Sequence, residues 1–279
     1  MNELLTIGQL AERTGVQPGT LRIWEQRHDF PHAERLPSGH RRYPVDQVER
    51  VLEVVRARES GLSLAAAVER ANRDSPVAPG APSIFAGLRK RRPDLAPYPV
   101  PKRMLVPISH AMEDECSARG GGAILVGSFQ RERFYRQAEP RWRAFARTAE
   151  LTVALGDFER PRAPKGAPIE IPIDRSHPLS REWAIVCDGP GVSACLAGWE
   201  RPGSPEDDAG RVFEMLWSVE PDVVREAARI GLDLAATQWP KLRELVPEWI
   251  SQPAAADASA VERVTALTNR MLAYVSAAG

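Results

Sequence analysis

A proline-rich break divides this sequence into two parts. Residues 74–82 contain three prolines and a glycine and show no apolar periodicity, which is typical of a semi-rigid linker. A chain of 279 residues is also long enough for two domains with their own cores. We therefore expect a small domain at residues 3–73, a larger one at 83–250, and a C-terminal helical segment at 251–279 that serves dimerisation or docking.

The small domain carries the signals of two short helices in close succession. Thr6 and Gln9 have the spacing of a capping box, Gly15 permits a sharp turn, and Pro18 suits the first turn of a second helix. Two helices joined by a glycine turn form a helix-turn-helix, whose second helix enters the major groove of DNA. The spacing of four apolar residues then predicts the inner face of a third helix: Val45, Val48, Leu52 and Val55.

A basic, hairpin-like stretch follows the second helix. Between Arg35 and Tyr43 there are three arginines, one histidine and no acid, with Ser38-Gly39 at the expected tip. Guanidinium groups bind phosphates and guanine edges, and a tyrosine hydroxyl can donate to a phosphate. The alternative is that these residues are ordinary solvated charges on the surface. That explanation suits a single isolated arginine better than the whole ordered set. The predicted DNA-binding residues are Thr20, Arg22, Trp24, Arg27, Arg35, His40, Arg41, Arg42 and Tyr43.

Composition narrows the class of protein. The 37 basic and 37 acidic residues balance, which argues against a polycation that coats DNA and leaves room for a local basic patch. No stretch approaches the roughly 18 apolar residues of a membrane span, and the N-terminus lacks the pattern of a secretory signal. Three scattered cysteines favour reduced thiols. These features predict a cytoplasmic protein without membrane association.

The first part resembles the MerR-type winged helix-turn-helix. The resemblance covers residues 3–73 and is carried by Thr6-Ile7-Gly8-Gln9-Leu10-Ala11, Gly15-Val16, Thr20-Leu21-Arg22-Ile23-Trp24-Glu25 and Ser38-Gly39-His40-Arg41-Arg42-Tyr43. It implies a DNA-binding regulator that binds a palindromic operator in double-stranded promoter DNA as a homodimer. Such regulators distort the promoter and so act on RNA polymerase indirectly, at a cost in DNA deformation of a few kcal/mol. Typical members continue into a long dimerisation helix, and the linker at Asp74 interrupts this chain there.

Strand and helix patterns alternate in the second part. Strands are predicted at residues 123–129, 151–158, 169–173, 183–188, 193–199 and 212–219, and helices at 104–119, 132–150 and 221–237. The proline-rich stretch 93–107 is expected to wrap over the surface. The chain is therefore expected to be multidomain, an all-α winged helix-turn-helix followed by an α/β (α+β) domain with a mixed sheet and C-terminal helices.

The second part resembles the DICT domain, a sensor of bacterial signalling proteins. The matching stretches are 109–116, 127–135, 181–188 and 196–200, within residues 83–230. The resemblance implies a sensory role for this part rather than a particular ligand. Its acidic and aromatic residues suggest small-molecule or light-linked sensing that controls the DNA-binding domain. A candidate sensor pocket is lined by four tryptophans, Trp142, Trp183, Trp199 and Trp217. The alternative is that they simply fill a core, which is the more common role of tryptophan.

Catalysis is not expected in this part. The consecutive acids Glu113, Asp114 and Glu115 point about 100° apart on a helix and do not converge. For the polar residues at strand ends, a buried Glu-Arg network around Arg131, Arg181 and Glu182 is at least as plausible as a catalytic site. No P-loop, nucleophile elbow or paired-histidine metal motif occurs in the sequence. We expect no catalytic residue, no metal site and no bound cofactor.

The cysteines and the C-terminus leave alternatives open. Cys187 and Cys195 lie in apolar strands that could neighbour each other as a redox pair, although buried inert thiols fit better. The C-terminal stretch has a capping box at Ser259 and Glu262, followed by apolar residues at helical spacing. This stripe must be buried, either on its own domain or against a second subunit.

Two other functions compete with an effector-responsive transcriptional regulator. A DNA-architectural or recombination accessory protein could use the same winged helix but has little need of a large second domain. A DNA-tethered enzyme would require a catalytic cluster, which the sequence does not display.

Overall fold

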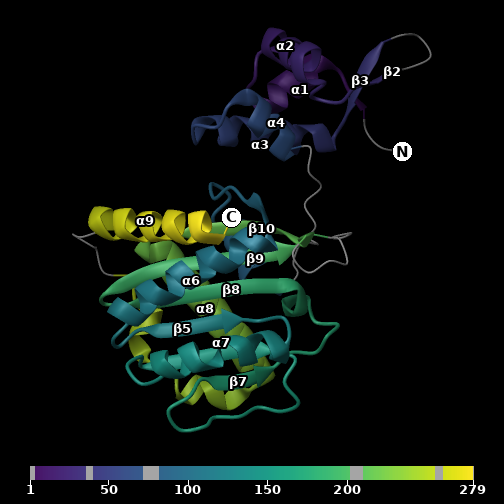
Figure 1. The fold of residues 1–279 in the computed structure, drawn as a ribbon. Coiled ribbons are helices and arrows are strands. Elements are labelled where there is room, and N and C mark those ends of the chain that lie inside the picture. The colour runs from purple at the N-terminus through teal and green to yellow at the C-terminus, as the bar shows by residue number, and fades with distance from the viewer. Residues whose placement is uncertain (1–3, 36–39, 72–81, 202–209, 255–259, 279) are drawn as a thin grey trace. The chain divides into compact units, whose positions relative to one another are not determined.

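The computed structural model describes residues 4–35, 40–71, 82–201, 210–254 and 260–278 (Figure 1). The chain divides into two units, residues 1–75 and 76–279. The expected hairpin tip Ser38-Gly39, most of the expected linker and Ser259 of the expected capping box lie outside the described residues. Among the residues described, no helix has the length and hydropathy needed to cross a membrane.

Short helices and a small sheet make up the described part of the N-terminal unit. The helices are α1 (Ile7–Thr14), α2 (Pro18–His28), α3 (Asp46–Glu59) and α4 (Leu64–Ala71). The strands are β1 (Leu4–Leu5), β2 (Glu34–Arg35) and β3 (Arg41–Pro44), which pair antiparallel in the order β1-β3-β2. Strands β2 and β3 follow α2 in the chain and form an antiparallel pair that we call the wing.

Local signals in the sequence fix the ends of these helices. The Thr6 side chain accepts from the backbone of Gln9, whose side chain accepts from the Thr6 backbone at 2.8 Å, so the capping box is confirmed. Gly15 ends α1 with φ of 72°, a left-handed conformation that glycine adopts without strain. Ser63 accepts from the Ala66 backbone at the start of α4, as expected for a cap.

The inner face of α3 is not the predicted one. Val45 lies before the helix and is 38% exposed, whereas the buried positions of α3 are Gln47, Val51, Val54 and Ala57. Apolar residues cover a broad arc of this helix, so more than one stripe fits the spacing. The amide oxygen of Gln47 accepts the backbone N–H of His32 at 2.9 Å, which holds this polar residue inside.

A seven-stranded mixed sheet organises the described part of the second unit. Its strands are β4 (Tyr98–Pro101), β5 (Ile124–Ser128), β6 (Leu151–Gly156), β7 (Ile169–Pro172), β8 (Glu182–Gly189), β9 (Val192–Glu200) and β10 (Val212–Ser218). Their order is β4-β10-β9-β8-β5-β6-β7. The β5-β6 and β6-β7 pairs are parallel and the remaining pairs antiparallel. The expected fold class, an α/β domain with a mixed sheet behind a helix-turn-helix domain, is confirmed.

Helices cover both faces of this sheet (Figure 1). The helical elements are α5 (Ile84–Arg91), α6 (Lys102–Arg119), α7 (Glu132–Phe145), α8 (Pro221–Gln238), α9 (Ala260–Ala278) and the 3-10 turns η1 (Pro178–Arg181), η3 (Pro240–Glu244) and η4 (Glu248–Ser251). Helices α5 and α8 pack on one face of the sheet, and α6, α7 and α9 pack on the other. Each face thus has its own apolar core.

The proline-rich stretch 93–107 does not wrap the surface as expected. Residues 98–101 form the edge strand β4, and residues 102–107 form the first turns of α6. An edge strand tolerates prolines because one side of it makes no ladder hydrogen bonds. Pro107 lies inside α6 and is buried there.

The three consecutive acids of α6 point to different neighbours, as expected from helix geometry. Glu113 accepts from the Trp142 indole at 2.8 Å and pairs with Arg141, both on α7. On the side of α9, Asp114 accepts from the Tyr274 hydroxyl and Glu115 pairs with Arg270 at 3.3 Å. Leu267 of α9 is buried against the same core. The C-terminal helix therefore docks on its own domain through a buried apolar contact and polar links.

The expected network of Arg131, Arg181 and Glu182 is wrong. Arg131 is placed 3.8 Å from Asp157, and Arg181 donates to the Glu200 backbone at 2.9 Å. Glu182 is fully buried and binds backbone N–H groups instead. Sequence proximity of Arg181 and Glu182 was misleading because successive residues at a strand start point to opposite faces.

The proposed Cys187–Cys195 pair is also wrong. Cys187 is the cross-strand partner of Ala194, and Cys195 is that of Val186, so the two thiols belong to the cores on opposite faces. Cys187 instead interacts with Cys116 of α6. All three cysteines are buried, and burial raises the pKa of Cys187 well above its usual value and that of Cys195 to about 12. Little reactive thiolate forms at neutral pH under these conditions.

Glu182 holds the start of α5, the first helix after the linker. Its carboxylate accepts the backbone N–H groups of Ile84 and Phe85 at 3.2 and 2.6 Å and a hydrogen bond from Ser83. These groups satisfy the first turn of the helix, whose N–H groups have no partner within the helix itself. Burial nevertheless raises the pKa of Glu182 to about 7.

This raised pKa predicts a pH-dependent stability. The native state binds the Glu182 proton more tightly than the unfolded state, so stability falls as pH rises from about 4.5 to about 7, by roughly 3 kcal/mol. We expect Glu182→Gln to remove this part of the pH dependence in urea unfolding at pH 5 to 8. The exposed Glu248→Gln is the control and should follow the wild type. Parallel curves for Glu182→Gln and wild type would contradict the assignment.

Candidate functional site

The outward face of α2 is a narrow, solvent-exposed stripe of residues. Leu21 is fully buried against the core, which turns four exposed residues at helical spacing to solvent: Gly19, Arg22, Ile23 and Gln26. Ile23 is 50% exposed and adds an apolar side chain to this stripe. The sequence analysis selected Arg22 and missed Ile23 and Gln26, whose signal was their spacing from Arg22.

The wing places basic side chains beside this helix. His40 and Arg41 are exposed, and Arg42 is half-buried with a guanidinium that donates to the Arg41 backbone at 3.0 Å. A groove of about 520 Å³ separates the start of α1 from the wing and α2, and Arg22, His40, Arg41 and Arg42 line it. The structure thus brings four of the predicted residues to one surface.

Glu25 links helix α2 to the wing. Its carboxylate pairs with the Arg41 guanidinium at 3.1 Å and accepts from the Tyr43 hydroxyl at 3.3 Å. Burial and the Glu25 carboxylate together raise the pKa of Tyr43 to about 12, so the hydroxyl remains a donor at neutral pH. Glu25 escaped the sequence analysis because an acid is unexpected in a phosphate-binding surface.

The other predicted DNA-binding residues occupy different environments. Tyr43 is only 1% exposed and belongs to the core of the N-terminal unit, so its expected contact with a phosphate is replaced by the bond to Glu25. Trp24 is half-buried, with its ring 6.4 Å from that of Phe30, and Thr20 is half-buried. Arg27 is exposed, and Arg35 lies in β2 with a side chain outside the described atoms.

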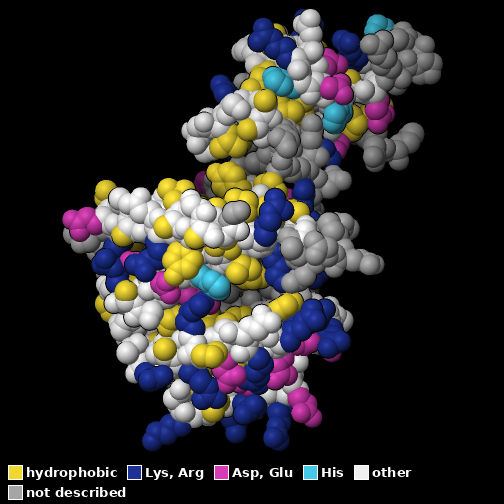
Figure 2. Space-filling view, in the orientation of Figure 1, with side chains coloured by type: hydrophobic (Ala, Val, Ile, Leu, Met, Phe, Trp, Pro, Cys, Tyr) yellow, Lys and Arg dark blue, Asp and Glu magenta, His cyan; other side chains and the backbone are white. Residues whose placement is uncertain are grey.

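Arginine and lysine side chains do not by themselves mark a DNA surface in this protein. Figure 2 shows them over much of the second unit as well, interleaved with acids. Many of the latter arginines are held in ion pairs, such as Arg136 with Glu170 at 2.6 Å and Arg211 with Glu200 at 2.6 Å. The candidate DNA-binding surface is therefore distinguished by the arrangement of α2 and the wing rather than by its density of positive charge.

The four tryptophans of the candidate sensor pocket do not share a cavity. Trp142, Trp183 and Trp217 pack in the core on the α6 and α7 face, whereas Trp199 belongs to the core on the α8 face. The indole N–H of Trp142 donates to Glu113, and that of Trp183 donates to Ser109 at 3.0 Å. These side chains fill two cores, which is the more common role for tryptophan.

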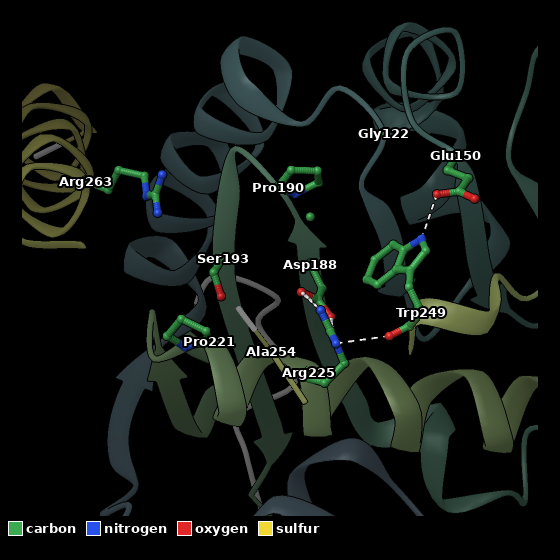
Figure 3. A pocket seen from close by; sticks show the side chains of 11 residues that line it. Gly122, Glu150, Asp188, Pro190, Ser193, Pro221, Arg225, Trp249, Ala254 and Arg263 are labelled. Atoms are coloured by element: carbon green, nitrogen blue, oxygen red, sulfur yellow. Dashed lines mark hydrogen bonds and ion pairs between the residues drawn. The ribbon is translucent and has the colours of Figure 1, made fainter. Parts of the chain in front are cut away.

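A cavity of a different composition opens at the end of the sheet (Figure 3). It has a volume of about 470 Å³ and lies between the β8–β9 hairpin, the first turn of α8, η4 and the start of α9. Asp188 and Arg225 face each other inside it, and Trp249 packs over the Arg225 guanidinium at 4.8 Å. Sequence reasoning missed Arg225 and Trp249 because they come from separate elements of the C-terminal third.

Comparisons with known proteins match both parts of the chain. Residues 5–73 match the family model described as MerR HTH family regulatory protein. Residues 83–201 match the DICT model, described as a sensory domain in diguanylate cyclases and two-component systems. The HTH-type transcriptional repressor CarA of Myxococcus xanthus is 36% identical over 74 residues. That stretch covers 26% of this chain and 26% of the relative.

Each match falls within one of the two units of the structure. The first falls on the helices and wing around Arg22 and Arg41, and the second covers α5 through β9 of the mixed sheet. Both resemblances noted in the sequence are thereby confirmed. Residues 5–73 thus form a MerR-type helix-turn-helix domain, and residues 83–201 form a DICT sensory domain.

Proposed function

We propose that α2 and the wing form the promoter-binding surface of an effector-responsive transcriptional regulator. The observation that carries this proposal is the Glu25 link, which fixes the wing arginine beside the recognition helix. A helix that enters the major groove needs flanking phosphate contacts to hold its orientation. The exposed His40 and Arg41 and the half-buried Arg42 are suited to that role.

The stripe on α2 supplies the chemistry for base recognition. Arg22 can make a bidentate contact to a guanine, Gln26 has the amide that matches an adenine edge, and Ile23 can contact a thymine methyl group. In this proposal Tyr43 and Glu25 position the wing without contacting DNA. Thr20, Arg27 and Arg35 remain proposed DNA-binding residues.

The remaining partners follow from the DNA-binding domain. We propose a homodimer on a palindromic promoter site in the cytoplasm, with RNA polymerase affected through the DNA and a small-molecule effector bound by the sensory domain. The proposal assigns no catalytic step to the chain. In support, each acid of the Glu113-Asp114-Glu115 run is engaged by another helix.

A genome-wide binding map of the full chain tests this function. A regulator predicts a small number of discrete sites within promoters, and an architectural protein predicts many dispersed sites. The Arg22→Ala variant serves as the control for specific binding, because it removes the central side chain of the α2 stripe. Dispersed binding that Arg22→Ala leaves unchanged would reject the proposed regulator.

A further inference from the structure

The cavity at the β8–β9 hairpin is framed by residues that β-sheet register places together. Asp188 and Ser193 are direct cross-strand partners, so both side chains lie on the α8 face at the end of the sheet. Helix α8 begins at this point, and Pro221 of its first turn lines the cavity with Arg225 one turn further. The volume of about 470 Å³ lies within the range of small-molecule sites.

One wall of the cavity is held rigidly. The Arg225 guanidinium pairs with Asp188 and donates to the backbone carbonyls of Trp249 and Gln252 at 3.2 and 2.6 Å. The Trp249 indole N–H donates to Glu150 at 2.8 Å (Figure 3). Trp249 is therefore fixed at its backbone, its ring face and its ring N–H. An aromatic wall that is already ordered loses little entropy when a flat ligand binds.

The side of the cavity opposite Trp249 offers hydrogen-bond donors that have no acceptor among the described residues. The Ser193 hydroxyl oxygen is buried and has no hydrogen-bond partner among the described residues. Helix α8 begins at Glu220 without a side-chain hydrogen bond that caps its first turn, within the part of the chain described. An uncapped helix start presents N–H groups and a partial positive charge, which favour an anion or a carbonyl oxygen. A buried hydroxyl without a partner is costly, so a polar group of a ligand would gain a favourable hydrogen bond there.

The charges around the cavity set the kind of ligand. Asp188 is neutralised by the adjacent Arg225, and the Glu150 carboxylate lies on the far side of Trp249 from it (Figure 3). The side chain of Arg263 extends from α9 toward the cavity. The cationic and helix-start groups thus gather at the Ser193 end, and the apolar surfaces of Trp249, Pro190 and Pro221 line the rest.

We propose that this cavity is the effector site of the sensory domain and binds a small planar aromatic acid. The ring lies along Trp249, and the carboxylate accepts from Ser193 and the first turn of α8. The inference rests on the proposal that the sensory domain receives an effector. Because Arg263 belongs to α9, a bound acid contacts the sheet, α8 and the docked C-terminal helix at once.

Titration of the full chain with benzoate, phenylacetate and indole-3-acetate tests this site in the absence of DNA. We expect saturable binding of at least one acid at one site per chain with Kd below about 1 mM, and weaker binding of cyclohexanecarboxylate, which has the charge without the flat ring. Ser193→Ala should weaken binding about tenfold, with an unfolding midpoint of the free protein no lower than that of wild type. The exposed Ser117→Ala is the matched control.

Two outcomes would overturn the assignment. One is that none of the three acids saturates the protein; the other is that Ser193→Ala binds as tightly as Ser117→Ala. Arg263→Gln provides a second variant at the cavity rim and is expected to weaken binding as well. These measurements need no DNA, so their failure leaves the proposed promoter-binding surface standing, and failure of DNA binding would leave this site standing.

Discussion

Replacing Asp188 with alanine is expected to lower the free energy of unfolding of the sensory domain by about 3–5 kcal/mol. Asp188 is 3% exposed and Arg225 is 8% exposed, and the two form an ion pair between β8 and α8. Removal of one partner leaves the other charge buried and uncompensated. The loss is expected in urea unfolding followed by far-ultraviolet circular dichroism.

Two further variants separate this effect from the small effect of removing an exposed charge. Asp233→Ala removes an exposed carboxylate from the same helix α8 and should change stability by no more than about 0.5 kcal/mol. The double variant Asp188→Leu, Arg225→Met should recover part of the loss, because an apolar pair can replace a buried ion pair. Full recovery is not expected, since Arg225 also holds the carbonyls of Trp249 and Gln252. An Asp188→Ala protein as stable as Asp233→Ala would contradict this role.

The second large effect concerns DNA. The triple variant Arg22→Ala, Arg41→Ala, Arg42→Ala should bind operator DNA at least about 100-fold more weakly at physiological salt. One of these side chains lies on the α2 stripe and two lie on the wing of the same groove. Fluorescence anisotropy with a labelled operator from the genome-wide map measures the change.

Arg56→Ala is the matched control for this series. Arg56 pairs with Glu49 on α3 and does not line the groove, so its loss changes the charge of the same domain at another place. The unfolding midpoint of each variant has to be recorded, because Arg41 also pairs with Glu25. If Arg56→Ala and the triple variant lose equal affinity, the predicted surface is wrong.

The features that could be predicted from the sequence were those fixed by local chemistry. The capping box of Thr6 and Gln9 and the left-handed turn at Gly15 depend on residues within one or two helical turns. Six of the seven strands described in the second unit were also predicted at their positions along the chain, because buried strands are apolar runs bounded by turns, whereas the edge strand β4 was missed. The basic wing followed from composition over nine residues.

Features that depend on long-range packing were missed. The inner face of α3 was shifted because Gln47 is held inside by a backbone group fifteen residues earlier. The partner of Cys187 is on α6 rather than on the neighbouring strand, since register sends Cys195 to the other face. Likewise, the cavity beside Trp249 joins residues from separate elements of the second unit, which no single stretch of sequence reveals.

The salt dependence of operator affinity tests the promoter-binding surface most directly. Each phosphate contact contributes about −0.9 to the slope of log affinity against log salt concentration. We predict that the slope of the triple variant is shallower than that of wild type by about two, whereas Arg56→Ala keeps the wild-type slope. Equal slopes for the triple variant and wild type would show that Arg41 and Arg42 do not contact phosphates, and would contradict the proposed surface.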